Sequence, residues 1–446
     1  MGLGYFQLTV TNQEDKYLVG NPQFTYFKTS YRRHTNFALE NVLLNFSGET
    51  YMDNNFGKKL YVNVPKNGDL IHRMYLVIDT NYQGDLLDLK KEIGVSAFSL
   101  IEYVEISIGD QVIDKHTGEW LHIFHELFID SSKNSLLCDM INIHNTTTTK
   151  GETKNNKDGL LYIPLIFWFN RNPGLALPLL ALNNNDIKIN VKFASKNKID
   201  NFPKNNSKSF IINNVKLLTE YIHLDTEEKQ LFASNTHNYL IEQIQYSDLN
   251  NVPLKEEITD NIEYEKYVHK FKIPFRHPVK ELFWCIQDNN VLDLELKEDK
   301  QSVGNNLFNY WLQLDSLKRQ HQMIEGHITI NGKELFEPKS SNYLMSVMKY
   351  QYHSGYGYSD LDVDDVVKYT KGSGVYCYSF AIFPEKHQPS GSLNFSALDR
   401  VELNLRLRRN KVENTDRITT NQKIIKFYAI NYNILKIASG QAGLLF

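Results

Sequence analysis

The feature of this 446-residue sequence that most constrains its fold is an internal repeat with a period of roughly 210–220 residues. Four pairs of segments occur in the same order in the two halves. They are LYVNVP with HRMYLVI (Leu60–Ile78) against HKFKIP with KELFWCI (His269–Ile286), IEYVEISIGDQVID (Ile101–Asp114) against IEGHITINGKELFE (Ile324–Glu337), NPGLALPLLALNNNDIKINVKF (Asn172–Phe193) against QPSGSLNFSALDRVELNLRL (Gln388–Leu407), and NNVKLLTEYIHL (Asn213–Leu224) against FYAINYNILKI (Phe427–Ile437). Four matches in register indicate that one structural unit of about 200 residues is duplicated.

Each unit is predicted to consist of antiparallel strands, because short runs alternate between apolar and polar residues with a period of two. The clearest runs are Leu60–Val64, Tyr103–Ile108, Ile187–Phe193, His269–Phe275, His327–Ile330 and Val401–Leu407. Such a unit must bury two sheet faces against each other, and the jelly roll is the commonest sandwich with long connecting loops. We therefore predict an all-β protein of two tandem antiparallel jelly-roll (β-sandwich or barrel) domains with few short helices. The expected divisions are an N-terminal arm (1–24), a first jelly roll (25–224) and a second jelly roll (225–446).

Two short helices are expected between the strands. Thr117 can cap the first of them, and Asp225 followed by Glu228 resembles a capping box for the second. The second helix lies in mid-chain, where a junction between domains is expected. The apolar face of the first helix is predicted to consist of Leu121, Phe124, Leu127 and Phe128.

No motif points to catalysis, a cofactor or a metal. The order of residues in HIFHE (His122–Glu126) differs from both zinc-peptidase motifs, so histidines beside a core are expected there. The acidic run Asp360–Asp365 lacks the glycine and glutamate of a calcium loop. The cysteines at 138, 285 and 377 have no metal-ligand spacing and predict reduced thiols. The sequence therefore favours a structural protein over an enzyme.

Charge and hydropathy restrict the possible partners. The net charge is −3, whereas proteins that coat nucleic acid usually carry a clear positive excess. The N-terminus lacks the pattern of a signal peptide or a myristoylation site. The apolar runs Leu160–Phe169 and Leu175–Leu182 are shorter than the ~20 residues that span a bilayer. Any membrane relation is thus expected to be peripheral.

Long polar tracts predict surface loops at Ser131–Gly159, Ser195–Ser209 and Ser354–Gly374. Asn145 and Asn205 belong to glycosylation sequons within these tracts, although no secretory route is expected to modify them. The last tract contains Tyr356 and Tyr358, whose rings can stack on sugars. A jelly-roll surface protein that binds a receptor or a glycan is therefore the alternative to a purely structural role.

Several segments resemble one family, the double jelly-roll major capsid proteins of nucleocytoplasmic large DNA viruses. The resemblance extends over the whole chain in the expected order. Its segments are GNPQFTYFKTSYRRHTNFALE (Gly20–Glu40), FWFNRNPGLALPLLAL (Phe167–Leu182), HLDTEEKQLFA (His223–Ala233), YLIEQIQ (Tyr239–Gln245), HPVKELFW (His277–Trp284), HQPSGSLNFSALDRVEL (His387–Leu403) and YAINYNILKIASGQAGLLF (Tyr428–Phe446).

The resemblance implies a structural function without cofactors. It implies a homotrimer that presents six similar sandwiches, so that a threefold capsomer occupies a nearly hexagonal position in an icosahedral shell. Neighbouring capsomers, minor capsid proteins and an inner viral membrane at the base are the implied partners, without direct contact to nucleic acid. The implied location is the virion capsid, assembled in the host cytoplasm.

The stretch FKTSYRRHTNFALE (Phe27–Glu40) then has two interpretations. Its basic and aromatic residues are typical of a nucleic-acid contact, but the charge balance and the resemblance favour a structural anchor. The expected anchor residues are Phe27, Tyr31, Arg32, Arg33 and Phe37, with the rings packing beneath the first jelly roll and the arginines binding carboxylates or carbonyls of the same trimer or of a minor capsid protein.

Overall fold

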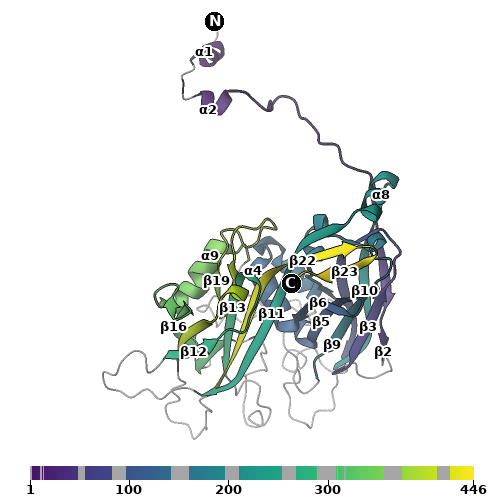
Figure 1. Ribbon diagram of the computed structural model, residues 1–446. Helices are drawn as coiled ribbons and strands as arrows, with labels where there is room; N and C mark the ends of the chain where they lie inside the picture. Colours follow the sequence, from purple (N-terminus) through teal and green to yellow (C-terminus); the bar gives the residue numbers. More distant parts are fainter. Residues whose placement is uncertain are drawn as a thin grey trace, which may run out of the picture. The chain divides into compact units, whose positions relative to one another are not determined.

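The computed structural model describes residues 3–10, 13, 15–48, 56–82, 97–141, 160–195, 210–253, 268–288, 308, 310–315, 318–355, 374–408 and 422–446 (Figure 1). The chain divides into two compact units, Met1–Phe37 and Ala38–Phe446. The first unit contains the short helices α1 (Leu3–Thr9) and α2 (Lys16–Val19). Residues 20–36 form neither helix nor strand.

The first half of the large unit is a sandwich of two antiparallel sheets. The sheet called here the open sheet has the order β1 (Phe37–Asn45), β10 (Phe210–Leu224), β4 (Leu70–Tyr82), β7 (Leu160–Pro164), with β8 (Leu177–Pro178) also paired to β4. The sheet opposite has the order β2 (Ser47–Gly48), β3 (Lys59–Val64), β9 (Ile187–Phe193), β5 (Ile101–Ile108), β6 (Gln111–Thr117).

The second half repeats this arrangement. The sheet called here the seam sheet has the order β11 (His237–Pro253), β22 (Gln422–Ala438), β13 (Pro278–Asp288), β19 (Tyr376–Ser379), with β20 (Leu393–Asn394) on β13 and β23 (Gln441–Leu444) on β22. The sheet opposite has the order β12 (Val268–Lys272), β21 (Val401–Leu407), β16 (Met323–Ile330), β17 (Lys333–Glu334), with β18 (Lys339–Ser340) on β16. A separate hairpin joins β14 (Trp311–Asp315) to β15 (Lys318–His321).

The duplication predicted from the sequence is confirmed by the strand order. The order β1-β10-β4-β7 in one half corresponds to β11-β22-β13-β19 in the other, and β3-β9-β5-β6 corresponds to β12-β21-β16-β17. Figure 1 shows β11, β22 and β13 side by side in the second half. All six predicted strand runs fall on strands of the structure, although β12 ends at Lys272, because Pro274 cannot donate to a ladder. The predicted class of two tandem antiparallel sandwiches is therefore confirmed.

Alternating burial explains why these strands form sandwiches. In β3, Leu60, Val62 and Val64 are buried while the residues between them are exposed. The second half has its own core between its two sheets, with Trp284 and Phe427 from the seam sheet and Leu403 from β21. The other face of the seam sheet belongs to a different cluster: Phe283, Tyr428 and their neighbours pack with the core of the first half.

The predicted helices are both present. Helix α4 (Gly118–Phe128) begins after Thr117, whose side chain accepts a hydrogen bond from Trp120 N at 3.1 Å. Helix α8 (Thr226–Ser234) begins after Asp225, which bonds Thr226 N, but Glu228 makes no reciprocal capping bond within the described residues. The remaining short elements are η1 (Ala97–Leu100), η2 (Ser131–Lys133), α5 (Asn134–Ile141), α6 (Trp168–Arg171), η3 (Pro173–Leu175), η4 (Leu179–Ala181), the π-helical turn η8 (Tyr343–Val347), α9 (Met348–Tyr352) and η9 (Phe395–Ala397). No helix of the described residues combines the length and apolar character needed to cross a bilayer.

Candidate functional site

The two halves meet at a seam where α4 of the first half packs on the seam sheet of the second. Trp120 is 1% exposed, and its ring centroid lies 5.5 Å from that of Phe283 and 5.5 Å from that of Tyr428. Phe283 and Tyr428 are register partners on β13 and β22. Aromatic pairs at such distances contribute about 0.5–1.5 kcal/mol beyond the burial of their area. The seam is therefore a buried aromatic contact that belongs to the same core cluster as the interior of the first half.

A carboxylate next to Trp120 collects polar groups from the second half. Glu119 Oε1 accepts hydrogen bonds from Tyr310 OH at 2.7 Å and from Lys426 Nζ at 2.9 Å, and Oε2 accepts one from Tyr428 OH at 2.7 Å. Burial and the Glu119 carboxylate raise the pKa values of Tyr310 and Tyr428, so both phenols stay protonated and donate. The helix cap at Thr117 thus positions a residue that joins two segments of the other half, β22 and the residue that precedes β14.

A second buried network at the seam is ionic. Glu242 on β11 accepts a hydrogen bond from Arg171 Nη1 at 2.8 Å and another from the Lys280 ammonium. The Glu242 side chain is 9% exposed and that of Lys280 is 2% exposed. Burial opposes ionisation of Glu242, but the two cations outweigh it and lower its pKa, so the carboxylate remains charged. Removal of one partner from such a network leaves a buried charge, which is strongly destabilising.

Strand β11 is also attached to β6 of the first half through its backbone and side chains. The Asp114 carboxylate accepts a hydrogen bond from Ile244 N at 3.2 Å, and Gln243 donates to the Ile113 carbonyl. Ile241, one residue before Glu242, is completely buried. The edge strand of the second half is therefore covered by the first half.

The equivalent strand of the first half is not covered. On β1, Leu39 is 55% exposed and Leu43 is 54% exposed. These residues share the outer face of the open sheet with Tyr75 and Leu218, which pair in register, and with Tyr162 on β7. Exposed apolar side chains gathered on one sheet face are typical of an interaction surface.

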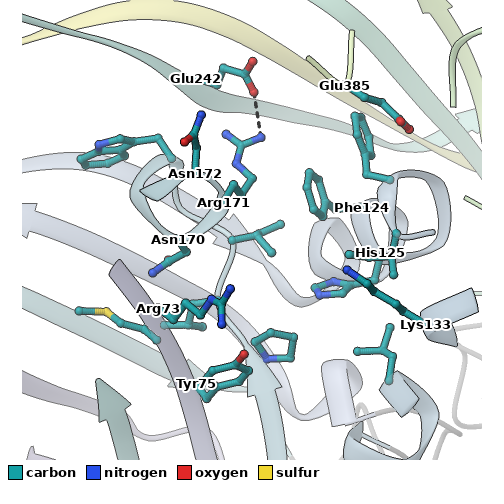
Figure 2. Close-up of a pocket in the computed structure, with 18 of the residues that line it drawn as sticks. Arg73, Tyr75, Phe124, His125, Lys133, Asn170, Arg171, Asn172, Glu242 and Glu385 are labelled. Carbon is teal, nitrogen blue, oxygen red and sulfur yellow. Dashed lines mark hydrogen bonds and ion pairs between the residues drawn. The ribbon is translucent and has the colours of Figure 1, made fainter. Parts of the chain in front are cut away.

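A pocket of about 770 Å³ lies where this outer face reaches the seam (Figure 2). Figure 2 shows Arg73 and Tyr75 on one side of the cavity and Phe124 and His125 on another, with the Arg171–Glu242 pair at its edge. Burial lowers the pKa of His125 to about 4, so its imidazole is neutral near pH 7. The lining is completed by mainly apolar residues of α5 and of the segment directly after β7, including Leu136, Leu137, Met140, Leu165 and Ile166.

The third buried cluster at the seam contains residues that can bind a metal. Glu281, His353 and Cys377 offer a carboxylate oxygen, an imidazole nitrogen and a sulfur that all lie within 4.8 Å of one another. The His353 Nε2–Glu281 Oε1 distance is 2.9 Å, and the two side chains are 1% and 0% exposed. Burial opposes a charge on His353, but Glu281 outweighs it and raises the pKa of the imidazole to about 12.

The residues predicted as functional from the sequence occupy different places. The five anchor residues Phe27, Tyr31, Arg32, Arg33 and Phe37 are exposed, and the Phe27 side chain is 97% exposed. The predicted surface residues Asn145, Asn205, Tyr356 and Tyr358 lie outside the described residues. The seam carboxylates Glu119, Glu242 and Glu281 were not singled out from the sequence. A usable signal existed only for the last, because Lys280-Glu281 interrupts an otherwise apolar strand.

Comparison with known proteins gives matches to capsid proteins along the whole chain. A family model described as "Major capsid protein N-terminus" matches residues 25–225, and one described as "Large eukaryotic DNA virus major capsid protein" matches residues 228–443. The major capsid protein of Pyramimonas orientalis virus is 35% identical over the full length of both chains. That of Paramecium bursaria Chlorella virus 1 is 30% identical, again over both full lengths.

Solved structures give the same result. The quasi-atomic model of the PBCV-1 virus capsid covers 95% of this chain and 100% of its own, with 28% identity and a TM-score of 0.70. The Faustovirus major capsid protein, at 9% identity, has a TM-score of 0.66 over 96% of this chain and 94% of its own, which shows a common fold.

Proposed function

This chain belongs to the major capsid protein family of large eukaryotic DNA viruses, and from that premise we propose that it assembles as a homotrimeric capsomer with six similar sides. The family gives the protein a structural role in the virion capsid, and no comparison indicates an enzymatic activity. The trimer, its pseudo-hexagonal arrangement in an icosahedral shell and the partners named below are our proposals. We also propose that the two jelly rolls comprise residues 25–224 and 225–446.

The observation that carries the trimer is the unequal covering of two equivalent sheets. The two halves repeat one topology, so a ring of three chains contains six similar sandwiches and two kinds of junction. One junction is the seam inside each chain, where the first half covers the seam sheet. The other would lie between chains, where the second half of one copy covers the open sheet of the next. The exposed Leu39 and Leu43 on the open sheet are what such a junction would bury.

The junction between chains should use a helix equivalent to α4. Helix α4 lies between β6 and β7, and the pair η8–α9 lies between β18 and β19, at the corresponding place of the second half. Tyr350 on α9 is 90% exposed, so this helix offers a large ring for a contact with another chain. In this proposal α9 of one copy docks on the outer face of the open sheet of the next, near Tyr75 and the pocket.

The experiment is a measurement of oligomeric state with two disrupting variants. We expect the wild-type chain to be a trimer by light scattering after size-exclusion chromatography. Leu43→Glu, on β1, and Tyr350→Glu, on α9, should each shift the protein toward monomer, because each places a charge in the apolar centre of the junction. Both side chains are exposed in the single chain, so the circular dichroism spectrum should not change.

The matched control is Leu231→Glu on α8, which also replaces an exposed apolar residue, at 59% exposure. It should leave the trimer intact because α8 packs through Phe232 at the Leu70–Ile222 end of the open sheet, whereas the proposed junction is centred on Leu43, Tyr75 and the pocket. A wild-type chain that stays monomeric at micromolar concentration would overturn the proposal. Trimers that persist in both disrupting variants would show that the junction lies elsewhere.

For the N-terminal arm we propose a role as an anchor at the base of the capsomer. Phe27, Tyr31 and Phe37 are exposed rings, and Arg32 and Arg33 offer guanidinium donors for carboxylates or carbonyls. Minor capsid proteins are the proposed binding partners, with an inner viral membrane on the same side. Neighbouring capsomers contact the other sides, assembly takes place in the host cytoplasm, and nucleic acid is not contacted directly. The net charge of −3 supports the last point.

A further inference from the structure

The buried cluster at Glu281, His353 and Cys377 has a chemistry that the capsid function does not require. Glu281 lies on β13, Cys377 on the neighbouring strand β19, and His353 directly after α9. In the register of the two strands, Glu281 pairs with Ser379 and Phe283 pairs with Cys377, so both ligand side chains project from the same sheet face. His353 reaches that face from a separate segment.

The polar atoms of this cluster are poorly satisfied by the protein. Glu281 is completely buried, and its two carboxylate oxygens make no hydrogen bond of acceptable geometry to the described residues, despite the 2.9 Å contact with His353 Nε2. Both ring nitrogens of His353 are in the same condition. Buried polar atoms without good partners cost about 1–3 kcal/mol each, so their convergence needs a reason.

The geometry points to a zinc site formed by Glu281 Oε1, the Nε2 nitrogen of His353 and Cys377 Sγ. A sulfur, a nitrogen and an oxygen ligand together suit Zn²⁺ better than Mg²⁺ or Ca²⁺, which prefer oxygen alone. A thiolate and a carboxylate also balance the two positive charges of the ion, so the complex with neutral imidazole has no net charge in this buried place. Binding would release the thiol proton, and any proton on the ligating nitrogen, to solvent.

The other ring nitrogen of His353 faces a carboxylate, the kind of group that usually lies behind a zinc-bound imidazole. Glu385 Oε1 lies 3.6 Å from His353 Nδ1 and is itself fixed by a hydrogen bond from Ser354 N at 2.7 Å. A carboxylate behind a ligating imidazole orients the ring and raises its basicity. Tetrahedral zinc ligands lie about 3.4 Å apart, so the Glu281–His353 contact must open by about half an ångström. Water would complete the four ligands.

The site would strengthen the seam between the two halves. Phe128 of α4 packs edge-on against the His353 imidazole, with 4.8 Å between ring centroids. Two residues after His353, Gly355 N donates to the Leu127 carbonyl at 2.8 Å, and Gly355 forms an isolated antiparallel β-bridge with Asp130. A metal bound to β13, β19 and His353 therefore ties the seam sheet to the segment that contacts the end of α4.

The test uses the full-length capsomer, purified without chelators and kept reduced with a phosphine. We expect about one zinc ion per chain by elemental analysis. Chelation should lower the midpoint of thermal unfolding, and ZnCl₂ should restore it. Replacement by Co²⁺ should give a thiolate-to-cobalt charge-transfer band in the near ultraviolet and visible bands of a four-coordinate ion. Substoichiometric zinc in the wild type together with no thiolate–cobalt band on Co²⁺ titration would overturn the site.

Two cysteine variants assign the band. Cys377→Ser should abolish the thiolate–cobalt band, whereas Cys285→Ser should retain it. Cys285 is a matched control because it is buried like Cys377. It lies on β13, and its Sγ contacts Glu119 Oε1 at 3.8 Å rather than His353. Should Cys377→Ser fail to fold, the wild-type spectrum and the Cys285→Ser spectrum still decide. A band that disappears in Cys285→Ser and persists in Cys377→Ser would place the metal elsewhere.

Discussion

The seam sheet and the open sheet have the same strand order but opposite surroundings. The face of the seam sheet that carries Phe283 is buried against α4, with Phe283 completely inaccessible. The corresponding strand of the open sheet carries Tyr75, which is only half-buried beside a pocket. The repeated sequence pairs these two positions, because HRMYLVI aligns with KELFWCI. The difference teaches that one copy of a duplicated surface is covered within the chain, while the other is left exposed, as the proposed junction between chains requires.

The charged residues of the two sheets also differ in burial. The seam sheet and α6 contribute the triad Arg171, Glu242 and Lys280, in which Glu242 and Lys280 are buried. The open sheet carries an exposed contact instead, His223 Nε2–Glu40 Oε2 at 2.9 Å. Charges at the seam are thus fixed by the fold of one chain. Exposed ion pairs contribute little, about 0–1 kcal/mol, and can be rearranged when another molecule binds.

The largest expected effect comes from breaking this triad at its buried carboxylate. Glu242→Leu should lower the free energy of unfolding by about 3–5 kcal/mol, because buried Lys280 would lose the carboxylate that compensates its burial and Arg171 would lose its ion-pair partner. The double variant Glu242→Leu/Lys280→Met should recover most of that loss. Urea unfolding followed by circular dichroism measures both.

The matched control for the triad is the partly exposed pair Lys192–Glu102 of the first half, with side chains 35% and 36% exposed. Glu102→Gln should change the free energy of unfolding by about 0.5 kcal/mol or less. Equal losses in Glu242→Leu and Glu102→Gln would mean that burial at the seam does not distinguish these charges.

The second prediction compares the paired aromatic positions directly. Phe283→Ala should cost about 3–5 kcal/mol, because it removes a buried ring from a packed seam. Tyr75→Ala should cost about 1 kcal/mol in a chain that cannot assemble. Both free energies are measured by urea unfolding in the Leu43→Glu background. A Tyr75→Ala loss as large as that of Phe283→Ala would remove the distinction between a closed and an open sheet.

The sequence predicted the duplicated topology because strand order follows from a local pattern repeated in register. It also predicted α4, because Thr117 caps the helix and Leu121, Phe124 and Leu127 form its buried face. It did not predict the triad, since Arg171, Glu242 and Lys280 are far apart in sequence and meet only through the packing of two sandwiches. The His353 cluster was missed for the same reason: no spacing rule connects residues 281, 353 and 377.

The third prediction concerns acid and the end of α4. Because burial lowers the pKa of His125 from 6.5 to about 4, folding favours its neutral form. The stabilisation is complete above pH 6.5 and is lost as the pH falls toward 4. At pH 5 the loss should be about 2 kcal/mol for His125, and buried His122, whose pKa is also lowered, acts in the same direction. Glu242, whose pKa is lowered from 4.5, adds to the loss only at still lower pH.

Urea unfolding at pH 7 and pH 5 measures this acid dependence. In His125→Gln the amide can still donate to the Leu121 carbonyl, which lies 2.7 Å from Nδ1 in the wild type. This variant should have a lower free energy of unfolding at pH 7, but that free energy should fall less between pH 7 and pH 5. His34→Gln in the exposed arm is the control and should behave as the wild type. An unchanged pH dependence in His125→Gln would show that the seam does not sense acid through this residue.

The smallest expected effect on stability comes from the arm that leads into β1. The double variant Arg32→Ala/Arg33→Ala should change the free energy of unfolding by less than about 0.5 kcal/mol, because both side chains are exposed. It should nevertheless reduce the yield of shells counted by electron microscopy, since the proposed anchor would lose both of its guanidinium groups. Lys28→Ala, in the same exposed arm, is the matched control for loss of charge. A normal shell yield from the double variant would show that the two arginines are not part of the anchor and that the assembly contacts lie on the open sheet alone.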